Sequence, residues 1–120
     1  MRKFQQTAIL ASIALIVALI TSSATVAAED LNSATYLVEA CRDFNSDKVG
    51  PIFRRGRCSG VISALAYVSF GISSCPPRGV THGQQVKVVV SYIDQRPARL
   101  HEDFRVLVLE AIRAAWPCKR

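Results

Sequence analysis

The sequence lacks an apolar run of the roughly 20 residues that a membrane-spanning helix needs. Its N-terminal apolar run, from Ala8 to Ile20, has about 13 residues. Arg2 and Lys3 precede this run and small residues ending in Val26-Ala27-Ala28 follow it, which is the layout of a cleavable signal peptide. The sequence therefore predicts export, with a signal peptide at residues 1–28 that is cut after Ala28, and no stable membrane insertion afterwards.

A lipid anchor and a second domain are also not indicated. The cysteine nearest to the predicted cut is Cys41, so the new N-terminus offers no thiol for acylation. Residues 29–120 make a product of 92 residues, enough for one small domain that buries about 60 to 65% of its unfolded surface. We expect a single soluble domain at residues 29–120 in the periplasm.

The charge of the predicted product is moderately basic. Thirteen Lys and Arg against nine Asp and Glu give a net charge of about +4, and the cations are scattered apart from Arg54, Arg55 and Arg57. Solubility accounts for this balance, and attraction to anionic cell-wall polymers, lipid headgroups or an acidic protein is the alternative. Because exported proteins rarely meet nucleic acid, we expect no nucleic-acid partner.

Catalytic motifs are missing from the sequence. It contains no G-x-S-x-G, no H-E-x-x-H, no glycine-rich phosphate loop and no paired acidic motif. Glu39, Asp43 and Glu110 are expected to be solvated or capping charges. The sequence therefore indicates a protein that is not an enzyme, with no catalytic residue and no cofactor.

The four cysteines are Cys41, Cys58, Cys75 and Cys118, an even set. In an oxidising compartment such a set predicts two disulfides. Neighbouring cysteines are separated by 16, 16 and 42 residues with no C-x-x-C, so neither a redox pair nor a zinc site is indicated. His82 and His101, far apart in the sequence, are interpreted as polar residues near helix ends and not as metal ligands.

Apolar residues recur at helical spacing in four segments, which predicts an all-α fold. The first helix spans 31–44, the second 57–71, the third runs from a capping box at Thr81 to a break at Arg96-Pro97, and the fourth spans 102–116. Turn residues between 45 and 56 predict a loop of about ten residues before the second helix. The β-branched run 86–93 would also suit a strand, but its period and the preceding cap favour a helix.

The second helix has two features that bear on packing. Its predicted inward stripe consists of Val61, Ala64, Leu65, Val68 and Ile72. A second strip of small residues, Ser59, Gly60 and Ser63, predicts that another helix or backbone approaches closely. Such packing would compensate for Gly60, which costs roughly 1 kcal/mol relative to Ala inside a helix.

Short connections favour a small four-helix up-and-down bundle. In that arrangement the end of the first helix lies near the start of the second, which pairs Cys41 with Cys58. The ends of the second and fourth helices point the same way, which pairs Cys75 with Cys118. On the chain-entropy model each disulfide stabilises the fold by about 3 to 4 kcal/mol.

Several short strings, in order and with consistent spacing, are similar to the Rap/Tai family of type VI secretion immunity proteins. The resemblance spans about residues 34 to 118 and is carried by Gly56-Arg57-Cys58-Ser59-Gly60-Val61-Ile62, Cys75-Pro76-Pro77 with Gly79-Val80-Thr81 and Gln84, Val88-Val89-Val90-Ser91-Tyr92-Ile93, Arg96-Pro97, and 111–115 with Trp116-Pro117-Cys118. It implies a small all-helical periplasmic protein, in this family often a homodimer. Such a protein binds a peptidoglycan amidase effector delivered by a rival or sister cell and occludes its substrate groove.

Two segments are our candidates for partner contact under this resemblance. One is the rigid connector Pro76, Pro77, Arg78, Gly79, whose stiffness lowers the entropy lost on docking, and the other is a turn with exposed Arg96 and Arg99. Ordinary helix connectors are the alternative for both. A periplasmic stress or chaperone-like helical protein with no amidase partner is the alternative function.

Overall fold

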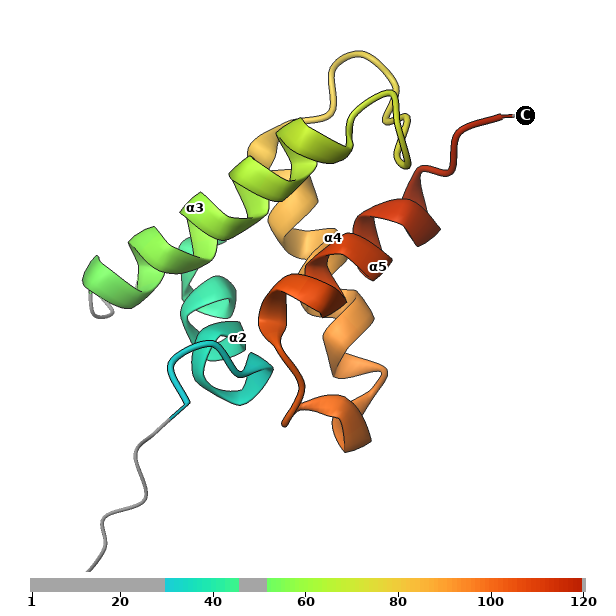
Figure 1. Ribbon diagram of the computed structural model, residues 1–120. Helices are drawn as coiled ribbons and strands as arrows, with labels where there is room; N and C mark the ends of the chain where they lie inside the picture. The colour runs from blue at the N-terminus through green and yellow to red at the C-terminus, as the bar shows by residue number, and fades with distance from the viewer. Residues whose placement is uncertain (1–29, 46–51, 120) are drawn as a thin grey trace, which may run out of the picture.

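The computed structural model describes residues 30–45 and 52–119, and within them the chain is all-α (Figure 1). Four α-helices and two short 3-10 turns follow one another along the chain: α2 (Ala34–Arg42), η1 (Asp43–Asn45), α3 (Ile52–Ser69), α4 (His82–Asp94), η2 (Pro97–Arg99) and α5 (Phe104–Ala115). None of the helices in these residues is both long and apolar enough to cross a membrane. The predicted signal peptide and its cut after Ala28 lie outside the described residues.

Side-chain caps define where three of the helices begin. The Ser33 hydroxyl accepts a hydrogen bond from the third residue of α2, and the Asp103 carboxylate does the same for the second residue of α5. Before α4, Thr81 and Gln84 form the reciprocal capping box that the sequence predicts. The β-branched run at 86–93 is therefore helix and not strand, because the box fixes the first turn and the apolar positions keep the helical period.

The core lies where α2, α4 and α5 meet and is closed on one side by α3. Its largest fully buried side chains include Phe104 at the start of α5, Leu37 of α2 and Ile93 of α4. Burial of side chains of this size contributes about 1.5 to 3 kcal/mol each. Backbone hydrogen bonds from Phe104 to Asn32 (2.8 Å) and from Ala34 to Glu102 (2.9 Å) hold the starts of α2 and α5 side by side.

Both predicted disulfides are present in the structure, with the predicted pairing. Cys41–Cys58 joins α2 to α3 inside the core, whereas Cys75–Cys118 joins the segment after α3 to the C-terminal segment near the surface. The predicted all-α four-helix class with two disulfides is thus confirmed. The two bonds differ in accessibility, since Cys41 and Cys58 are buried and Cys75 is exposed.

The predicted start of the second helix is wrong by about one turn and a half. Helix α3 begins at Ile52, so residues 52–56 are helical and not part of the loop. Gly56, which we interpreted as a turn residue, lies on the solvent side of the helix, where its cost is only that of its low helix propensity.

The predicted inward stripe of this helix is wrong at three of its five positions. Ala64, Val68 and Ile72 are exposed, whereas Val61 and Leu65 are half-buried and pack against the core. The fully buried residues of the helix are Cys58, Ile62 and Ser69. The disulfide to Cys41 explains the difference, because it turns Cys58 inward and so brings the positions four and eleven residues later to the same side.

The close packing predicted at Gly60 is not found among residues 30–45 and 52–119. A Cβ atom placed on Gly60 would meet nothing within 4 Å, and the same holds for Gly56. Both glycines therefore lie on an open face of α3, and nothing in the described residues compensates for their helix propensity.

Candidate protein-binding surface

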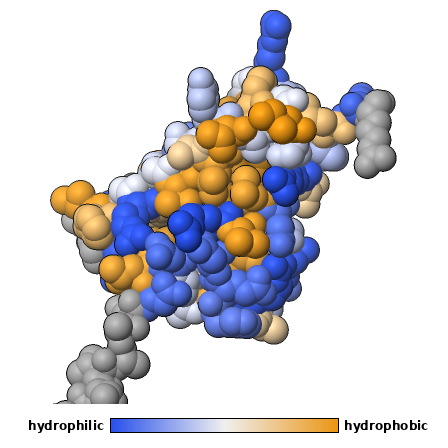
Figure 2. Space-filling model, viewed as in Figure 1, coloured by the Kyte–Doolittle hydropathy of each residue, from blue (hydrophilic) through white to orange (hydrophobic). Residues whose placement is uncertain are grey.

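The solvent face of α3 carries apolar and small residues where a soluble helix normally carries charges. Its centre is a row that lies within about 40° of Gly60 around the helix axis. We name this row the α3 outer face, and it consists of Phe53, Gly56, Gly60, Ala64 and Tyr67, all exposed. Figure 2 shows hydrophobic surface over α3 and the segment that follows it, above a largely hydrophilic lower half. The two aromatic side chains at its ends are 70% (Phe53) and 84% (Tyr67) exposed.

A second apolar surface lies at the C-terminal end of α3, beside the segment 70–80 that we call the connector. It is a groove of about 750 Å³. Three of its side chains are large and strongly exposed: Tyr67 (84%), Phe70 (63%) and Ile72 (81%). We call it the connector groove, and it is lined by Ser63, Ala66, Tyr67, Val68, Phe70, Ile72, Pro76, His82 and Gln85.

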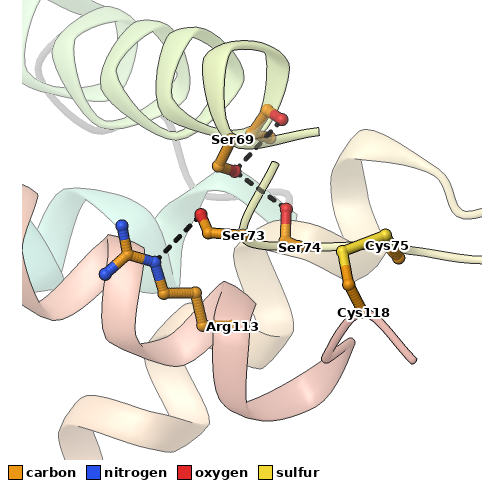
Figure 3. Close-up of a disulfide and its surroundings, with 7 residues drawn as sticks. Ser69, Ser73, Ser74, Cys75, Arg113 and Cys118 are labelled. Atoms are coloured by element: carbon orange, nitrogen blue, oxygen red, sulfur yellow. Dashed lines mark hydrogen bonds between the residues drawn. A yellow bond between two sulfur atoms is a disulfide. The ribbon is translucent and has the colours of Figure 1, made fainter. Parts of the chain in front are cut away.

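The connector is held in place by a buried pair of hydroxyl groups. The Ser69 and Ser74 oxygens lie 2.8 Å apart, both side chains are buried, and Ser69 also donates to the Ala66 carbonyl (Figure 3). Gly71, at φ 73°, supplies the left-handed turn between them. The tight turn projects Phe70 and Ile72 into solvent while its polar groups point inward.

The other end of the connector is tied to the C-terminal segment. The Cys75–Cys118 disulfide makes this link, and the Cys75 amide donates to the Trp116 carbonyl at 2.7 Å. Arg113 of α5 donates to the Ser73 hydroxyl at 3.0 Å (Figure 3). Because the connector is fixed at both ends, its exposed apolar side chains lose little conformational entropy when a partner docks.

At the edge of the groove, His82 fastens α4 to α3. Its Nε2 lies 2.9 Å from the Ser59 hydroxyl, Nδ1 lies 3.4 Å from the Gln85 side-chain oxygen, and the ring meets Phe44 edge-on at 5.3 Å. A serine hydroxyl beside a histidine suggests a nucleophile and its base. Here, however, the second ring nitrogen of His82 faces the Gln85 side-chain amide, and not the carboxylate that would stabilise an imidazolium. We assign His82 a positioning role at the start of α4, which agrees with its interpretation from the sequence as a polar residue near a helix end.

The predicted connector residues lie at or next to the groove. Pro76 lines it and is half-buried, whereas Pro77, Arg78 and Gly79 continue along the connector as exposed residues. Gly79 has φ 91°, a backbone conformation that other residues rarely adopt. The structure thus brings this candidate segment together with exposed Tyr67 and with Val68 and Ile72, which we had assigned to the inward stripe.

The other candidate segment is placed elsewhere and is not an open cationic turn. Arg99 is half-buried and bonds Glu102 (2.7 Å) and Glu110 (2.6 Å), so its guanidinium holds the pKa of both carboxyls below their ordinary value. Arg96 stacks over the Tyr92 ring at 3.6 Å and donates to the Tyr92 carbonyl. Both arginines are engaged in holding the turn between α4 and α5, and neither lines the connector groove.

Metal-binding geometry is not found in residues 30–45 and 52–119, where no three His, Cys, Asp or Glu side chains come together. The surface is therefore best described as apolar, rigid and suited to another protein.

The model of the Rap1a immunity proteins matches residues 33–118 of this sequence. The chain belongs to the Rap1a immunity protein family. Among curated proteins no match is found.

The family match covers the entire surface described above. The α3 outer face, the connector and the Cys75–Cys118 disulfide all lie within residues 33–118. Membership confirms the resemblance to Rap/Tai proteins and identifies the chain as an immunity protein, whose function is to bind an effector. A Rap1a protein therefore needs a surface complementary to another protein, and these two apolar surfaces are the strongest candidates.

Proposed function

We propose that this Rap1a protein is a periplasmic immunity protein that neutralises a peptidoglycan amidase delivered by type VI secretion. It acts by binding, as a stoichiometric inhibitor, and it has no catalytic step of its own. Two disulfides and the signal-peptide layout of residues 1–28 support a location in an oxidising compartment outside the cytoplasm. A homodimer, which the family resemblance implies, is part of this proposal.

The observation that carries the proposal is the connector groove. Tyr67, Phe70 and Ile72 are exposed large side chains on a rim that buried hydroxyls and a disulfide hold rigid. Binding energy in protein interfaces is concentrated in a few such anchors surrounded by less critical contacts. We expect these three side chains to enter the substrate groove of the amidase, so that the peptide stem of peptidoglycan no longer reaches the amidase's catalytic residues.

The polar residues beside the groove support specificity. Arg78 lies exposed on the connector, and His82 and Gln85 form part of the groove wall. Charged groups at the rim of an interface mainly steer association and discriminate between partners. The candidate residues Pro76 to Gly79 thus keep their proposed role, with the apolar anchors of α3 and Phe70 added to them.

The test is inhibition of the amidase encoded beside this gene, assayed by digestion of purified peptidoglycan. Wild-type protein should form a complex that co-elutes on a sizing column and should abolish digestion at one equivalent. Phe70→Asp should weaken binding by roughly 30-fold or more, as expected for an interface anchor. Val106→Asp is the matched control, because Val106 is an exposed apolar residue (48%) on α5 outside the groove.

The alternative function, a chaperone-like protein, is favoured by the same exposed apolar side chains. The two functions differ in selectivity. An immunity protein inhibits one amidase and does not suppress aggregation of unrelated unfolded proteins, whereas a chaperone does the reverse. Suppressed aggregation of several clients without a complex with the amidase would reject the proposed function.

A further inference from the structure

We propose that the Cys75–Cys118 disulfide, which we call the connector disulfide, is a redox-sensitive switch that controls the connector groove. The closed bond holds the connector against the C-terminal segment 117–119. When a dithiol reduces the bond, both segments loosen and the groove loses a wall, while the helices stay folded. The consequence for the amidase rests on the proposed function, whereas the loosening depends only on contacts within this chain.

The connector disulfide lies outside the helical core. Cys75 belongs to the connector between α3 and α4, and Cys118 lies beyond the end of α5. Among the residues that the structure describes, none of the buried apolar residues that form the core belongs to 70–80 or 117–119. Peripheral segments of this kind can open locally at a lower free energy than global unfolding requires. Reduction of this bond can therefore leave the core intact, with Cys41–Cys58 still joining α2 to α3.

The other links between the connector and the end of α5 are weak. The Cys75 amide donates to the Trp116 carbonyl at 2.7 Å, and the Arg113 side chain donates to the Ser73 hydroxyl at 3.0 Å at an exposed position. Water competes for such hydrogen bonds, so each contributes little net free energy. They add to the order that the disulfide imposes and do not replace it.

The tight turn at the start of the connector does not depend on the disulfide. Its buried pair of hydroxyl groups joins residues five positions apart, and the Gly71 amide donates to the Ser74 carbonyl at 2.8 Å. The segment that depends on the switch is therefore 75–80, between this turn and the capping box of α4. It includes Pro76, which lines the groove, so reduction removes one wall of the groove.

The disulfide exchange can begin at Cys75, which is exposed, whereas Cys118 is half-buried. A thiolate of the dithiol attacks the Cys75 sulfur and forms a mixed disulfide, and Cys118 leaves as a thiolate. Lys119 directly follows Cys118, and a neighbouring cation stabilises this leaving thiolate. The second thiol of the reductant then displaces Cys75. Two electrons have passed from the dithiol to the protein, the two cysteines take up the protons that the dithiol has lost, and the reductant leaves as a disulfide.

Reduction should weaken partner binding through conformational entropy. In the oxidised protein the segment 75–80 is ordered before a partner docks, whereas in the reduced protein docking must restore this order. Each residue whose backbone is fixed adds to that entropic cost, so we expect the affinity for the amidase to fall at least tenfold. A disulfide-containing oxidant reverses the exchange and should restore the affinity.

The first experiment measures backbone ¹⁵N order parameters of wild-type protein and of the double variant Cys75→Ser with Cys118→Ser, which mimics the reduced state. In the double variant the amides of Arg78 and Gly79 should fall below about 0.6, while those of α2 and α4 stay near 0.85. Leu37→Ala is the matched control, because it removes a buried core side chain and keeps the disulfide, so its connector should stay ordered. Equal order parameters at Arg78 and Gly79 in wild type and double variant, or loss of order in α2 and α4 as well, would overturn the inference.

The second experiment measures the affinity of each sample for the amidase. The double variant should bind at least tenfold more weakly than oxidised wild type, and wild type that has been reduced and then reoxidised should bind as before. Leu37→Ala should bind like wild type at a temperature where it is folded. Equal affinity of the double variant and wild type would reject control of binding by the switch. If oxidised wild type does not bind the amidase, the proposed function fails, and the order parameters alone decide whether the switch exists.

Discussion

The two disulfides should differ in how readily they are reduced. This difference tests the positions that the structure gives them. Cys41 and Cys58 are 1% and 0% exposed inside the core, whereas Cys75 is exposed and Cys118 half-buried. Thiol–disulfide exchange needs a thiolate to reach a sulfur atom, so access decides which bond is attacked first. We expect limiting amounts of a small dithiol to reduce Cys75–Cys118 first and to leave Cys41–Cys58 intact.

The loss of stability follows from the lengths of the closed loops. The separations are 43 residues for Cys75–Cys118 and 17 residues for Cys41–Cys58, which correspond to about 4 and about 3 kcal/mol of chain entropy. Removing Cys75–Cys118 should therefore lower the free energy of unfolding by about 4 kcal/mol. For a domain of this size that loss lowers Tm by roughly 15 to 30 °C.

The assay combines partial reduction, alkylation and mass spectrometry with thermal unfolding. Alkylation of the partly reduced protein should label Cys75 and Cys118 before the other two cysteines. The double variant Cys75→Ser with Cys118→Ser should keep its helical signal at low temperature and unfold in the lower range given above. Labelling of Cys41 and Cys58 first, or a change in Tm of only a few degrees, would refute the reasoning from access and loop length.

Three further substitutions test the supports of the surface. Thr81→Ala removes the cap of α4 and should cost about 1 kcal/mol in urea unfolding, and an unchanged midpoint would contradict the capping role. Ser74→Ala leaves the buried Ser69 hydroxyl without its 2.8 Å partner and should cost about 1 to 3 kcal/mol, with faster amide hydrogen exchange in the connector as the second readout. Arg99 favours the charged form of Glu110, so Glu110 contributes stability above its ordinary pKa of 4.5, and this stability is lost as pH falls through its lower folded-state pKa. The variant Glu110→Gln should therefore lose less stability than wild type on acidification. An identical dependence of stability on acid pH in the two proteins would exclude this ion pair as a cause.

Part of the fold followed from local sequence patterns. The capping box at Thr81 specified where α4 begins, since its two hydrogen bonds form between residues three positions apart. Helical spacing of apolar residues predicted the helices themselves, and their order and short connections were enough to pair Cys41 with Cys58 and Cys75 with Cys118. These features depend on neighbours along the chain or on the direction of consecutive elements.

Only part of the candidate surface could be predicted by the same reasoning. The sequence indicated Pro76 to Gly79 as a rigid connector, and this segment does border the groove. It did not indicate that Tyr67 and Phe70 are exposed, because apolar residues on a helix are by default assigned to the core. Arg99 was expected to be exposed, and only the folded chain brings Glu110 of α5 to it.

The amino-acid sequence by itself determined the helical class, the capped helix starts, the disulfide pairs and the family, since each depends on residue types, order and spacing. The tertiary structure alone decided which side of α3 faces the core. That helix carries apolar residues all around, so its own periodicity leaves its rotation undetermined. The bond from Cys58 to Cys41 selects one rotation, and this choice turns Phe53, Gly60 and Tyr67 toward solvent and makes them available to a partner.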